Sequence, residues 1–347
     1  MAFVEVDGSE GEGGGQILRT AIAFSAILRR PVRVAKIRAG RRVPGLRRQH
    51  LSALEVLGRV FGGEVEGASE GSSAVTFRPG EARLSELSVD MGTAASVTLV
   101  LQAVVPAVAL SGRKLRLELT GGTDVPWSPT FDFVDRVLRP ALRAVGVAFD
   151  TRAARRGYYP RGGGRVTSVI EQCQSLKPLE LVSRQKVSGV GIISRSGSLP
   201  SHVADRQARA ASSLLEGAGL RVLAKEVSVE ESDSPGSSIL VHGAGPGAYL
   251  GSDGIGARGR PAEEVGRDAA SRFLAEAESG GCMDENLADM VLPLLSLAPS
   301  PSRVRVRATT SHLTSGLELA RLFTGCRWSV DDQGVSSVVT VVPGRLS

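Results

Sequence analysis

The chain has 347 residues, of which 42% are apolar, and it carries a net charge of +6 with a sequence pI of about 9.6. A chain of this size buries roughly 75% of its unfolded surface, which is enough for a substantial core. The longest apolar stretch, residues 97–110, is too short to span a bilayer. The three cysteines lie far apart and lack Cys/His ligand spacing, which argues against a structural zinc site and favours a reducing, cytoplasmic setting.

The basic charge is almost entirely arginine. Lysine accounts for five of the 42 basic residues, so 37 are arginines. Arginine is the side chain best suited to bidentate phosphate contacts. The composition therefore fits a nucleic-acid partner, although charge alone does not define a fold.

The first predicted element is a short strand at residues 3–6 that leads into the sequence G-S-E-G-E-G-G-G-Q-I-L-R at residues 8–19. Such a glycine turn, feeding a helix N-terminus, lets backbone N–H groups approach an anion. It lacks the G-K-[ST] ending of a P-loop and the G-x-G-x-x-G spacing of a dinucleotide fold, so a plain turn beside a helix is the alternative. Glu12 among the glycines, with Arg19 two turns on, favours a metal–phosphate site.

After this turn, the pattern predicts three copies of one α/β unit, each with a helix, strand, loop, helix and strand in that order. In the first copy we expect these at residues 16–28, 32–37, 38–48, 49–61 and 64–66. In the second copy we expect them at 94–110, 114–119, 121–129, 130–145 and 147–150. In the third copy we expect them at 286–296, 303–308, 309–316, 317–323 and 326–330.

A different segment separates the second and third copies. We expect a strand at 187–193, a helix at 204–216, strands at 220–229 and 238–242, a glycine-rich loop at 243–259 and a helix at 261–278. This reads as an inserted α/β domain of about 100 residues, a normal size for a small domain. The predicted division is a large domain of residues 1–183 and 281–347 and an inserted small domain of residues 184–280.

The loop at residues 38–48 carries five arginines and ends at a helix start with Gln49 and His50. A solvated basic loop is one interpretation. Because five guanidiniums in eleven residues repel one another, an anionic partner is the stronger one, and RNA phosphate is the natural candidate. An aromatic content of 4% argues against a wide base-stacking surface, so recognition of an RNA end fits better.

Three further residues carry chemistry with open alternatives. His312, in T-T-S-H-L-T-S-G, is either a helix-cap or surface histidine, or a nucleophile whose neutral imidazole attacks phosphorus. Asp289, at the start of an apolar helix, either complements the helix dipole or contacts a nucleotide or His312. Gln102, inside an apolar helix, has either a ligand or a backbone carbonyl as its partner.

Five sequence blocks together resemble the RNA 3′-terminal phosphate cyclase family. They are D-G-S-E-G-E-G-G-G-Q-I-L-R-T at 7–20, I-R-A-G-R-R-V-P-G-L-R-R-Q-H-L at 37–51, T-G-G-T-D-V-P-W-S-P at 120–129, G-Y-Y-P-R-G-G-G at 157–164 and S-H-L-T-S-G at 311–316. The resemblance runs to about residue 330. It implies a large α/β domain of three βαβαββ-like units, similar to enolpyruvyl transferases, with a smaller inserted domain.

The resemblance also implies a reaction. An RNA 3′-terminal phosphate is converted to a 2′,3′-cyclic phosphate with ATP and a divalent metal, magnesium or manganese. AMP passes from ATP to a histidine and then to the RNA 3′-phosphate, and the neighbouring 2′-OH expels it. The partner implied is RNA with a 3′-terminal phosphate, with no membrane, and a homodimer is left open.

The site residues follow from the same resemblance, position by position. His312 matches the histidine that takes AMP, and Glu12 matches the metal-binding glutamate. The phosphate and RNA-end positions are Arg19, Arg38, Arg41, Gln49 and His50. The nucleotide-pocket positions are Gln102, Pro129, Asn286, Leu287, Ala288, Asp289 and Met290.

This sequence departs from the family pattern at two of those positions. Asn286 stands where an aromatic residue or histidine is expected, and Met290 stands where a glutamine is expected, which leaves the nucleotide preference open. One alternative is a non-catalytic RNA-binding relative that acts in ribosome biogenesis, but such relatives lack the nucleophilic histidine. Another is a small-molecule transferase on the same scaffold.

Overall fold

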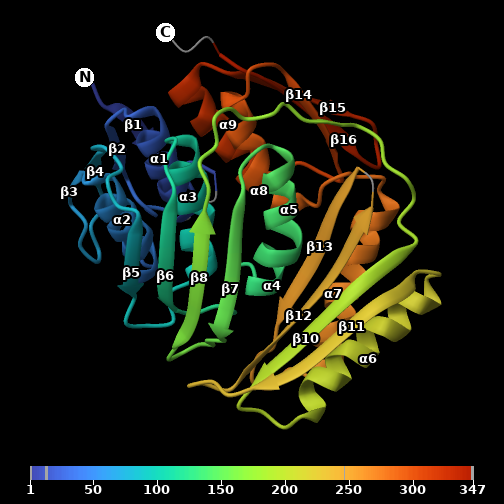
Figure 1. The fold of residues 1–347 in the computed structure, drawn as a ribbon. Helices are drawn as coiled ribbons and strands as arrows, with labels where there is room; N and C mark the ends of the chain where they lie inside the picture. The colour runs from blue at the N-terminus through green and yellow to red at the C-terminus, as the bar shows by residue number, and fades with distance from the viewer. Residues whose placement is uncertain (1, 12–14, 246, 345–347) are drawn as a thin grey trace.

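The computed structural model describes residues 2–11, 15–245 and 247–344, and both helices and strands occur throughout the chain (Figure 1). Within these residues the strands form four sheets of four strands each. The predicted mixed α/β class is confirmed.

The first sheet has the strand order β1-β2-β4-β3, with β1 parallel to β2 and the other pairs antiparallel. Helix α1 connects the parallel pair, as parallel neighbours require a crossover. The elements are β1 (Val4–Asp7), α1 (Gly15–Leu28), β2 (Val32–Ala35), α2 (Arg48–Phe61), β3 (Glu64–Glu66) and β4 (Val75–Arg78).

The second sheet has the same pairing pattern in the order β5-β6-β8-β7. Its second crossover is one continuous helical segment with three parts, α4, η1 and α5. The elements are β5 (Glu86–Asp90), α3 (Val97–Leu110), β6 (Leu115–Gly121), α4 (Phe131–Phe133), η1 (Val134–Leu138), α5 (Arg139–Ala144), β7 (Phe149–Arg155) and β8 (Gly164–Ile170).

The third sheet repeats that pattern once more in the order β9-β14-β16-β15, with β9 far from the other strands in sequence. The elements are β9 (Glu180–Leu181), α8 (Glu285–Val291), the 3₁₀ helix η2 (Leu292–Leu297), β14 (Ser302–Val306), α9 (Ser311–Thr324), β15 (Arg327–Asp332) and β16 (Ser337–Val342).

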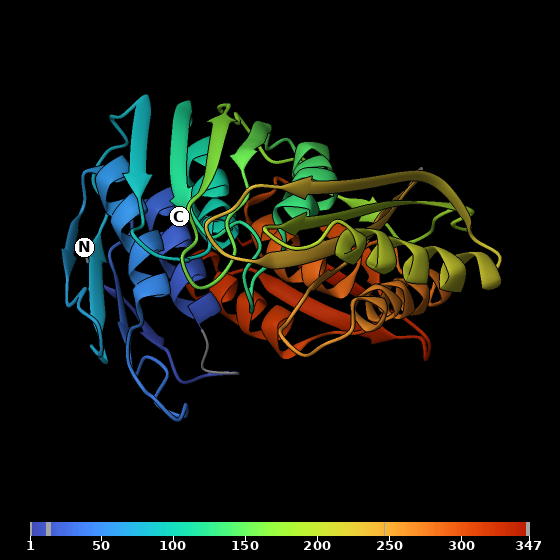
Figure 2. The ribbon, with the colours of Figure 1, turned by 90° about the horizontal axis from the view of Figure 1, so that it is seen from below.

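The helices of these three sheets meet in the middle of the molecule, and the sheets lie around them (Figure 2). Helix α1 packs against α2, α3 and α9. The rings of Phe24 in α1 and Phe323 in α9 stack with their centroids 5.7 Å apart. Almost every side chain of α3 is buried, which is the environment that an all-round apolar helix requires.

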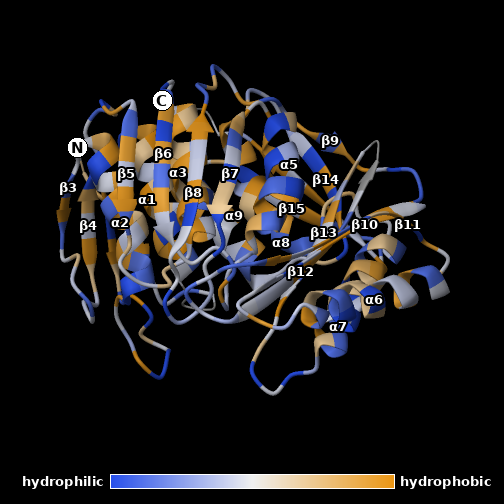
Figure 3. Cartoon of the chain, turned by 60° about the horizontal axis from the view of Figure 1, so that its bottom comes forward, coloured by the Kyte–Doolittle hydropathy of each residue, from blue (hydrophilic) through white to orange (hydrophobic). Residues whose placement is uncertain are grey.

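The remaining sheet, in the order β11-β10-β12-β13, lies at the far end of the molecule from β1–β4 and carries α6 and α7 on one face (Figure 1). These two helices cover a separate buried apolar cluster and turn polar sides outward (Figure 3). The domain division at residues 184 and 280 stays a prediction. The elements are β10 (Gly189–Gly197), α6 (His202–Gly217), β11 (Arg221–Glu230), β12 (Gly236–Gly245), β13 (Ala248–Ile255) and α7 (Ala262–Glu278).

Two predicted loops are wrong. Most of the glycine-rich segment 243–259 belongs to the antiparallel strands β12 and β13. Glycine is needed there for packing, because a Cβ at Gly251 would lie 2.6 Å from Val137. The loop predicted at 309–316 is the start of α9, because the Thr310 hydroxyl accepts the Leu313 N–H at 2.8 Å and caps the helix.

The turn at residues 157–164 anchors the inserted sheet. Tyr158 is 2% exposed, and a Cβ at Gly236 or Gly197 would lie within 2.5 Å of its ring. These two glycines face each other across β10 and β12, so they form a socket for the ring. The Tyr158 side chain therefore has a packing role rather than contact with a substrate.

Candidate functional site

Two adjoining cavities lie among the central helices α1, α3, α8 and α9. The larger contains side chains from α1, α3 and α8–η2, and the smaller contains side chains from α1 and α9. Both are lined by Gln16 and Thr20. The two cavities therefore meet along one face of α1.

The larger cavity brings together four of the predicted site residues, Arg19, Gln102, Asp289 and Met290. They come from three helices that are distant in sequence. The Gln102 amide contacts the Met290 sulfur, with Nε2 and Sδ 3.2 Å apart. Gln102 thus has a side-chain partner on α8, which corrects the backbone-carbonyl alternative.

The smaller cavity is lined by His312, together with Ser315 and Gly316 of α9 and the α1 residues Gln16 and Thr20. His312 is half-buried in the first turn of α9 rather than in a loop. A helix N-terminus presents N–H groups and a positive dipole end, which favour an anion beside this imidazole.

Sequence reasoning missed Gln16 and Thr20. The signal was present, because residues 16, 19, 20 and 23 have the i, i+3, i+4, i+7 spacing of one helix face, and all four line the larger cavity. Arg19 alone was selected because its charge stood out. The remaining members of that face, Gln16, Thr20 and Ala23, are uncharged, and the sequence pattern gives them no role.

Asp289 is tied to the helix that carries His312. Its Oδ1 accepts a hydrogen bond from the Thr310 hydroxyl at 2.5 Å, and Thr310 caps α9. The N-cap of α8 is Asp284, whose carboxylate accepts the Leu287 N–H, so Asp289 lies beyond the first turn. The helix-dipole interpretation of Asp289 is therefore wrong, and its contact lies on the His312 side.

Arg19 and His50 lie together beside the glycine turn. A Cβ at Gly15 would lie 2.4 Å from the His50 ring and 2.9 Å from Nη1 of Arg19, so only glycine fits. Burial lowers the pKa of the Arg19 guanidinium to about 10, which still leaves it charged at neutral pH. No carboxylate among the described residues pairs with it. A half-buried guanidinium that no described carboxylate neutralises is suited to an anionic ligand.

His50 is a neutral hydrogen-bond donor in this arrangement. Burial is the largest cause that lowers the pKa of His50, and the positive charges of Arg19, Arg38 and Arg47 lower it further, to about 4. Its Nδ1 accepts the Arg47 N–H at 3.1 Å, which leaves the proton on Nε2. His50 therefore presents an N–H beside Arg19.

The loop at residues 38–48 projects from the body of the protein (Figure 2). The Arg38 guanidinium donates to the carbonyls of Val43 and Gly45 at 2.9 and 3.2 Å, so it also holds the loop closed. Arg41 and Gln49 are exposed and line neither cavity. The structure therefore places these two residues on the surface rather than in the cavities.

The other nucleotide-pocket positions do not line the two cavities. Leu287 and Ala288 are fully buried in the core, and Asn286 is exposed. The Pro129 carbonyl accepts a hydrogen bond from Thr98 at 2.8 Å, one helical turn before Gln102 in α3. Of the run 286–290, only Asp289 and Met290 reach the cavity.

Glu12, the predicted metal ligand, lies outside the described residues. Across residues 2–11, 15–245 and 247–344, no group of three His, Cys, Asp or Glu side chains could hold a metal ion. A magnesium ion needs fewer protein ligands than such a cage supplies, since one or two carboxylates and the phosphates of a substrate suffice. Asp289 is the described carboxylate of the larger cavity.

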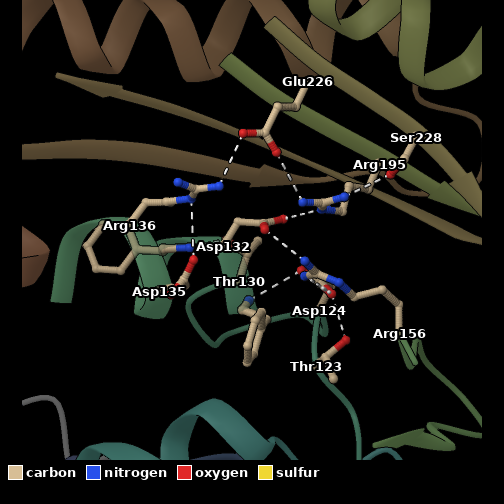
Figure 4. A network of polar contacts seen from close by, with 12 residues as sticks. Thr123, Asp124, Thr130, Asp132, Asp135, Arg136, Arg156, Arg195, Glu226 and Ser228 are labelled. Atoms are coloured by element: carbon tan, nitrogen blue, oxygen red, sulfur yellow. Dashed lines mark hydrogen bonds and ion pairs between the residues drawn. The ribbon is translucent and has the colours of Figure 1, made fainter. Parts of the chain in front are cut away.

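A buried charge network, which the sequence did not reveal, joins the inserted sheet to α4 (Figure 4). Asp132 accepts hydrogen bonds from Arg156 at 2.7 Å and from Arg195 of β10 at 2.9 Å. Arg156 also contacts Asp124 at 3.2 Å. Burial alone would raise the pKa of Asp132, but the two guanidiniums outweigh burial and hold it below its ordinary value.

The fold and this cluster define an α/β protein in which a histidine, an arginine and several uncharged polar side chains surround two adjoining cavities. A family model described as RNA 3′-terminal phosphate cyclase matches residues 10–330. The chain therefore belongs to the RNA 3′-terminal phosphate cyclase family.

Relatives named RNA 3′-terminal phosphate cyclase are similar over nearly the whole chain. The protein of Desulfurococcus amylolyticus is 44% identical over 330 residues, covering 93% of this chain and 92% of its own length. That of Pyrococcus furiosus is 43% identical over 324 residues, covering 93% and 94%. That of Thermococcus kodakarensis is 41% identical over 347 residues and covers both chains completely.

In the part of the chain that the structure describes, none of the helices is long and apolar enough to cross a membrane.

Proposed function

We propose that this protein converts an RNA 3′-terminal phosphate to a 2′,3′-cyclic phosphate at the cost of ATP, through a covalent His312–AMP intermediate. One observation carries the proposal. His312 and the set Gln102, Asp289 and Met290 line two cavities that meet at Gln16 and Thr20. A nucleotide held by the larger cavity would present its phosphates toward the His312 imidazole in the smaller one.

The chemistry proceeds in three displacements at phosphorus. A nitrogen of neutral His312 attacks the α-phosphorus of ATP, a P–N bond forms, and pyrophosphate leaves with the electrons of the broken P–O bond. An oxygen of the RNA 3′-phosphate then attacks the AMP phosphorus and releases His312. Finally the 2′-OH attacks the 3′-phosphorus, loses its proton and expels AMP.

The residues around the cavities would position these groups and neutralise their charge. Arg19, which no described carboxylate neutralises, would bind a phosphate, and His50 would donate its Nε2 proton to the same group. Because the 2′-OH already lies beside the 3′-phosphorus, orientation and charge neutralisation supply most of what the last step needs. Arg41 and Gln49 would bind the RNA end.

A divalent cation, magnesium or manganese, would supply further charge neutralisation at the phosphates when bound. Glu12 is the proposed ligand, and Asp289 is the described carboxylate within the larger cavity. A cytoplasmic location and a homodimer belong to the same proposal.

The test is intact-mass analysis after incubation with ATP and magnesium or manganese. We expect the mass of one AMP group on the wild-type protein and none on His312→Ala. His202→Ala is the matched control, because His202 is exposed at the start of α6, and it should keep the adduct. RNA binding without any adduct on the wild-type protein would overturn the enzymatic proposal and leave a non-catalytic RNA-binding relative.

A further inference from the structure

The loop between β6 and α4 displays a tryptophan to solvent. Trp127 is 94% exposed, the most exposed of the large apolar side chains in the described residues. The second tryptophan, Trp328, is half-buried and donates its indole N–H to Glu318 at 3.0 Å. No described residue contacts the Trp127 ring through stacking, cation–π contact or a hydrogen bond. An exposed indole contributes none of the free energy that a buried aromatic side chain adds to the stability of a fold.

The backbone at Trp127 is strained. Its φ is +68°, in the left-handed region that glycine and asparagine favour and bulky residues avoid. Pro126 and Trp127 form the corner of a tight turn. In turns of this kind, the residue after the proline has a positive φ and is usually glycine. Strain of this kind in a loop is an indicator of function rather than of packing.

The loop is held rigidly on both sides of that corner. The Ser128 hydroxyl donates to the Val125 carbonyl at 2.8 Å, and the Thr130 N–H donates to Asp253 at 2.6 Å. Before the corner, Asp124 is buried and bound by Arg156. The backbone that carries the indole is therefore held in place, so a ligand that stacks on Trp127 would cost little loop entropy.

The same loop is bonded to helix α3, which lines the larger cavity. Pro129, two residues after Trp127, accepts the Thr98 hydrogen bond at 2.8 Å. Thr98 and Gln102 lie one turn apart on α3, and Gln102 lines the larger cavity. The exposed ring is thus carried by the rim of the proposed site while remaining outside the cavity.

We propose that Trp127 stacks on a nucleobase of the single-stranded RNA close to its 3′ end, an inference that rests on the proposed function. An exposed aromatic ring on an ordered loop is a usual partner of an unpaired base. A single platform also suits a chain with few aromatic residues that recognises an end rather than a long strand. The adenine of ATP has the same stacking chemistry, so the experiment must separate the two sources.

The test uses fluorescence of Trp328→Phe, which leaves Trp127 as the sole tryptophan. We expect a short RNA with a 3′-phosphate to quench this emission and ATP alone to leave it unchanged. Replacing one nucleotide near the 3′ end by an abasic unit should abolish the quench, and replacing distant ones should not. Unchanged emission with RNA, equal quenching by ATP, or quenching indifferent to every abasic position would overturn the proposal.

A second variant separates binding from structure. Trp127→Asn keeps a side chain that tolerates positive φ, so its Tm should be no lower than that of the wild type. Its KM for RNA should rise roughly 5- to 150-fold, the loss of one base stack, while self-adenylation is unchanged. Trp127→Phe should keep most of the affinity. A lowered Tm with an unchanged KM would show a structural role and contradict the stacking.

The two proposals fail differently. Fluorescence quenching requires binding alone, so it is read without any chemistry. A wild-type protein that forms no AMP adduct but shows position-dependent quenching would remove the proposed reaction and keep the stacking. A protein that cyclises RNA but whose Trp127 emission is not quenched would keep the proposed reaction and remove the stacking.

Discussion

At the scale of single residues, the site depends on charges whose surroundings change their chemistry. Arg19 keeps its charge without a described carboxylate beside it, and His50 loses its charge because burial and three arginines oppose protonation. The neutral His50 imidazole beside the Arg19 guanidinium gives two hydrogen-bond donors with a single positive charge. This arrangement binds a phosphate without the added repulsion of a second cation.

The low pKa of His50 predicts acid sensitivity. The folded protein holds His50 neutral down to about pH 4, whereas the unfolded chain binds a proton near its ordinary pKa of 6.5. The stability from neutral His50 is therefore complete above pH 6.5 and is lost as the pH falls toward 4. The loss amounts to roughly 3 kcal/mol.

We expect urea unfolding to show this loss in the wild-type protein as the pH falls from 7 to 4. In His50→Gln, whose amide oxygen can still accept the Arg47 N–H, the pH dependence should be shallower by about that amount. His202→Gln, at an exposed position, should follow the wild type. Parallel pH curves for the wild type and His50→Gln would show that His50 titrates normally.

At the scale of elements, the cap of α9 connects two parts of the site. Thr310 accepts the Leu313 N–H and donates to Asp289, so one hydroxyl fixes the start of the helix that carries His312 and holds α8 beside it. Both hydrogen bonds are partly buried, so removing the Thr310 hydroxyl would leave the Leu313 N–H and the Asp289 carboxylate without this partner, which lowers the free energy of unfolding.

Removing this hydroxyl should weaken both stability and chemistry. Thr310→Ala should lower the free energy of unfolding by about 1–2 kcal/mol, the range for a lost N-cap. It should also slow self-adenylation, because His312 lies in the first turn. Thr310→Ser keeps the hydroxyl and should restore both quantities. Equal adenylation rates in the two variants, measured by single-turnover mass analysis, would show that the cap does not position His312.

Sequence patterns predicted most of the helices that pack between the three similar sheets, but not the roles of small residues. The helices at 16–28 and 49–61 were visible in apolar spacing, because one face of each is buried. The segment 243–259 was not read as strands, because its glycines meet Val137 and Phe273 across tertiary contacts that no local pattern records. The cap at Thr310 was similarly hidden by a run of hydroxyl residues that resembles a loop.

The candidate site shows the same limit. Motif resemblance located Gln102, Asp289, Met290 and Arg19, which the fold brings to one cavity from three helices. Resemblance could not tell which members of the run 286–290 face that cavity, since helical phase decides it. Nor did it single out Gln16 and Thr20 within the block at 7–20, because the cavities that these residues line are completed by α3, α8 and α9.

At the scale of the whole molecule, the inserted sheet is held by buried charge rather than by apolar contact alone. Asp132 binds Arg156 of the large part and Arg195 of β10, and Arg195 also binds Ser228 of β11 at 2.9 Å (Figure 4). Tyr158 occupies its glycine socket in the same sheet. The attachment lies on the loop and helix that also carry Pro129, so docking of the inserted sheet supports the rim of the site.

Breaking this network should loosen the attachment. Asp132→Ala leaves Arg156 and Arg195 buried with less compensation, and such losses cost about 3–5 kcal/mol. Asp135→Ala, one turn on, removes more exposed pairs to Arg136 and Arg139 and should cost at most about 1 kcal/mol. We expect urea unfolding of Asp132→Ala at a lower midpoint, and proteolysis of the native protein between residues 184 and 280 at a higher rate. Equal midpoints and cleavage rates for the two variants would mean that the Tyr158 socket and apolar packing, rather than the charges, hold the inserted sheet in place.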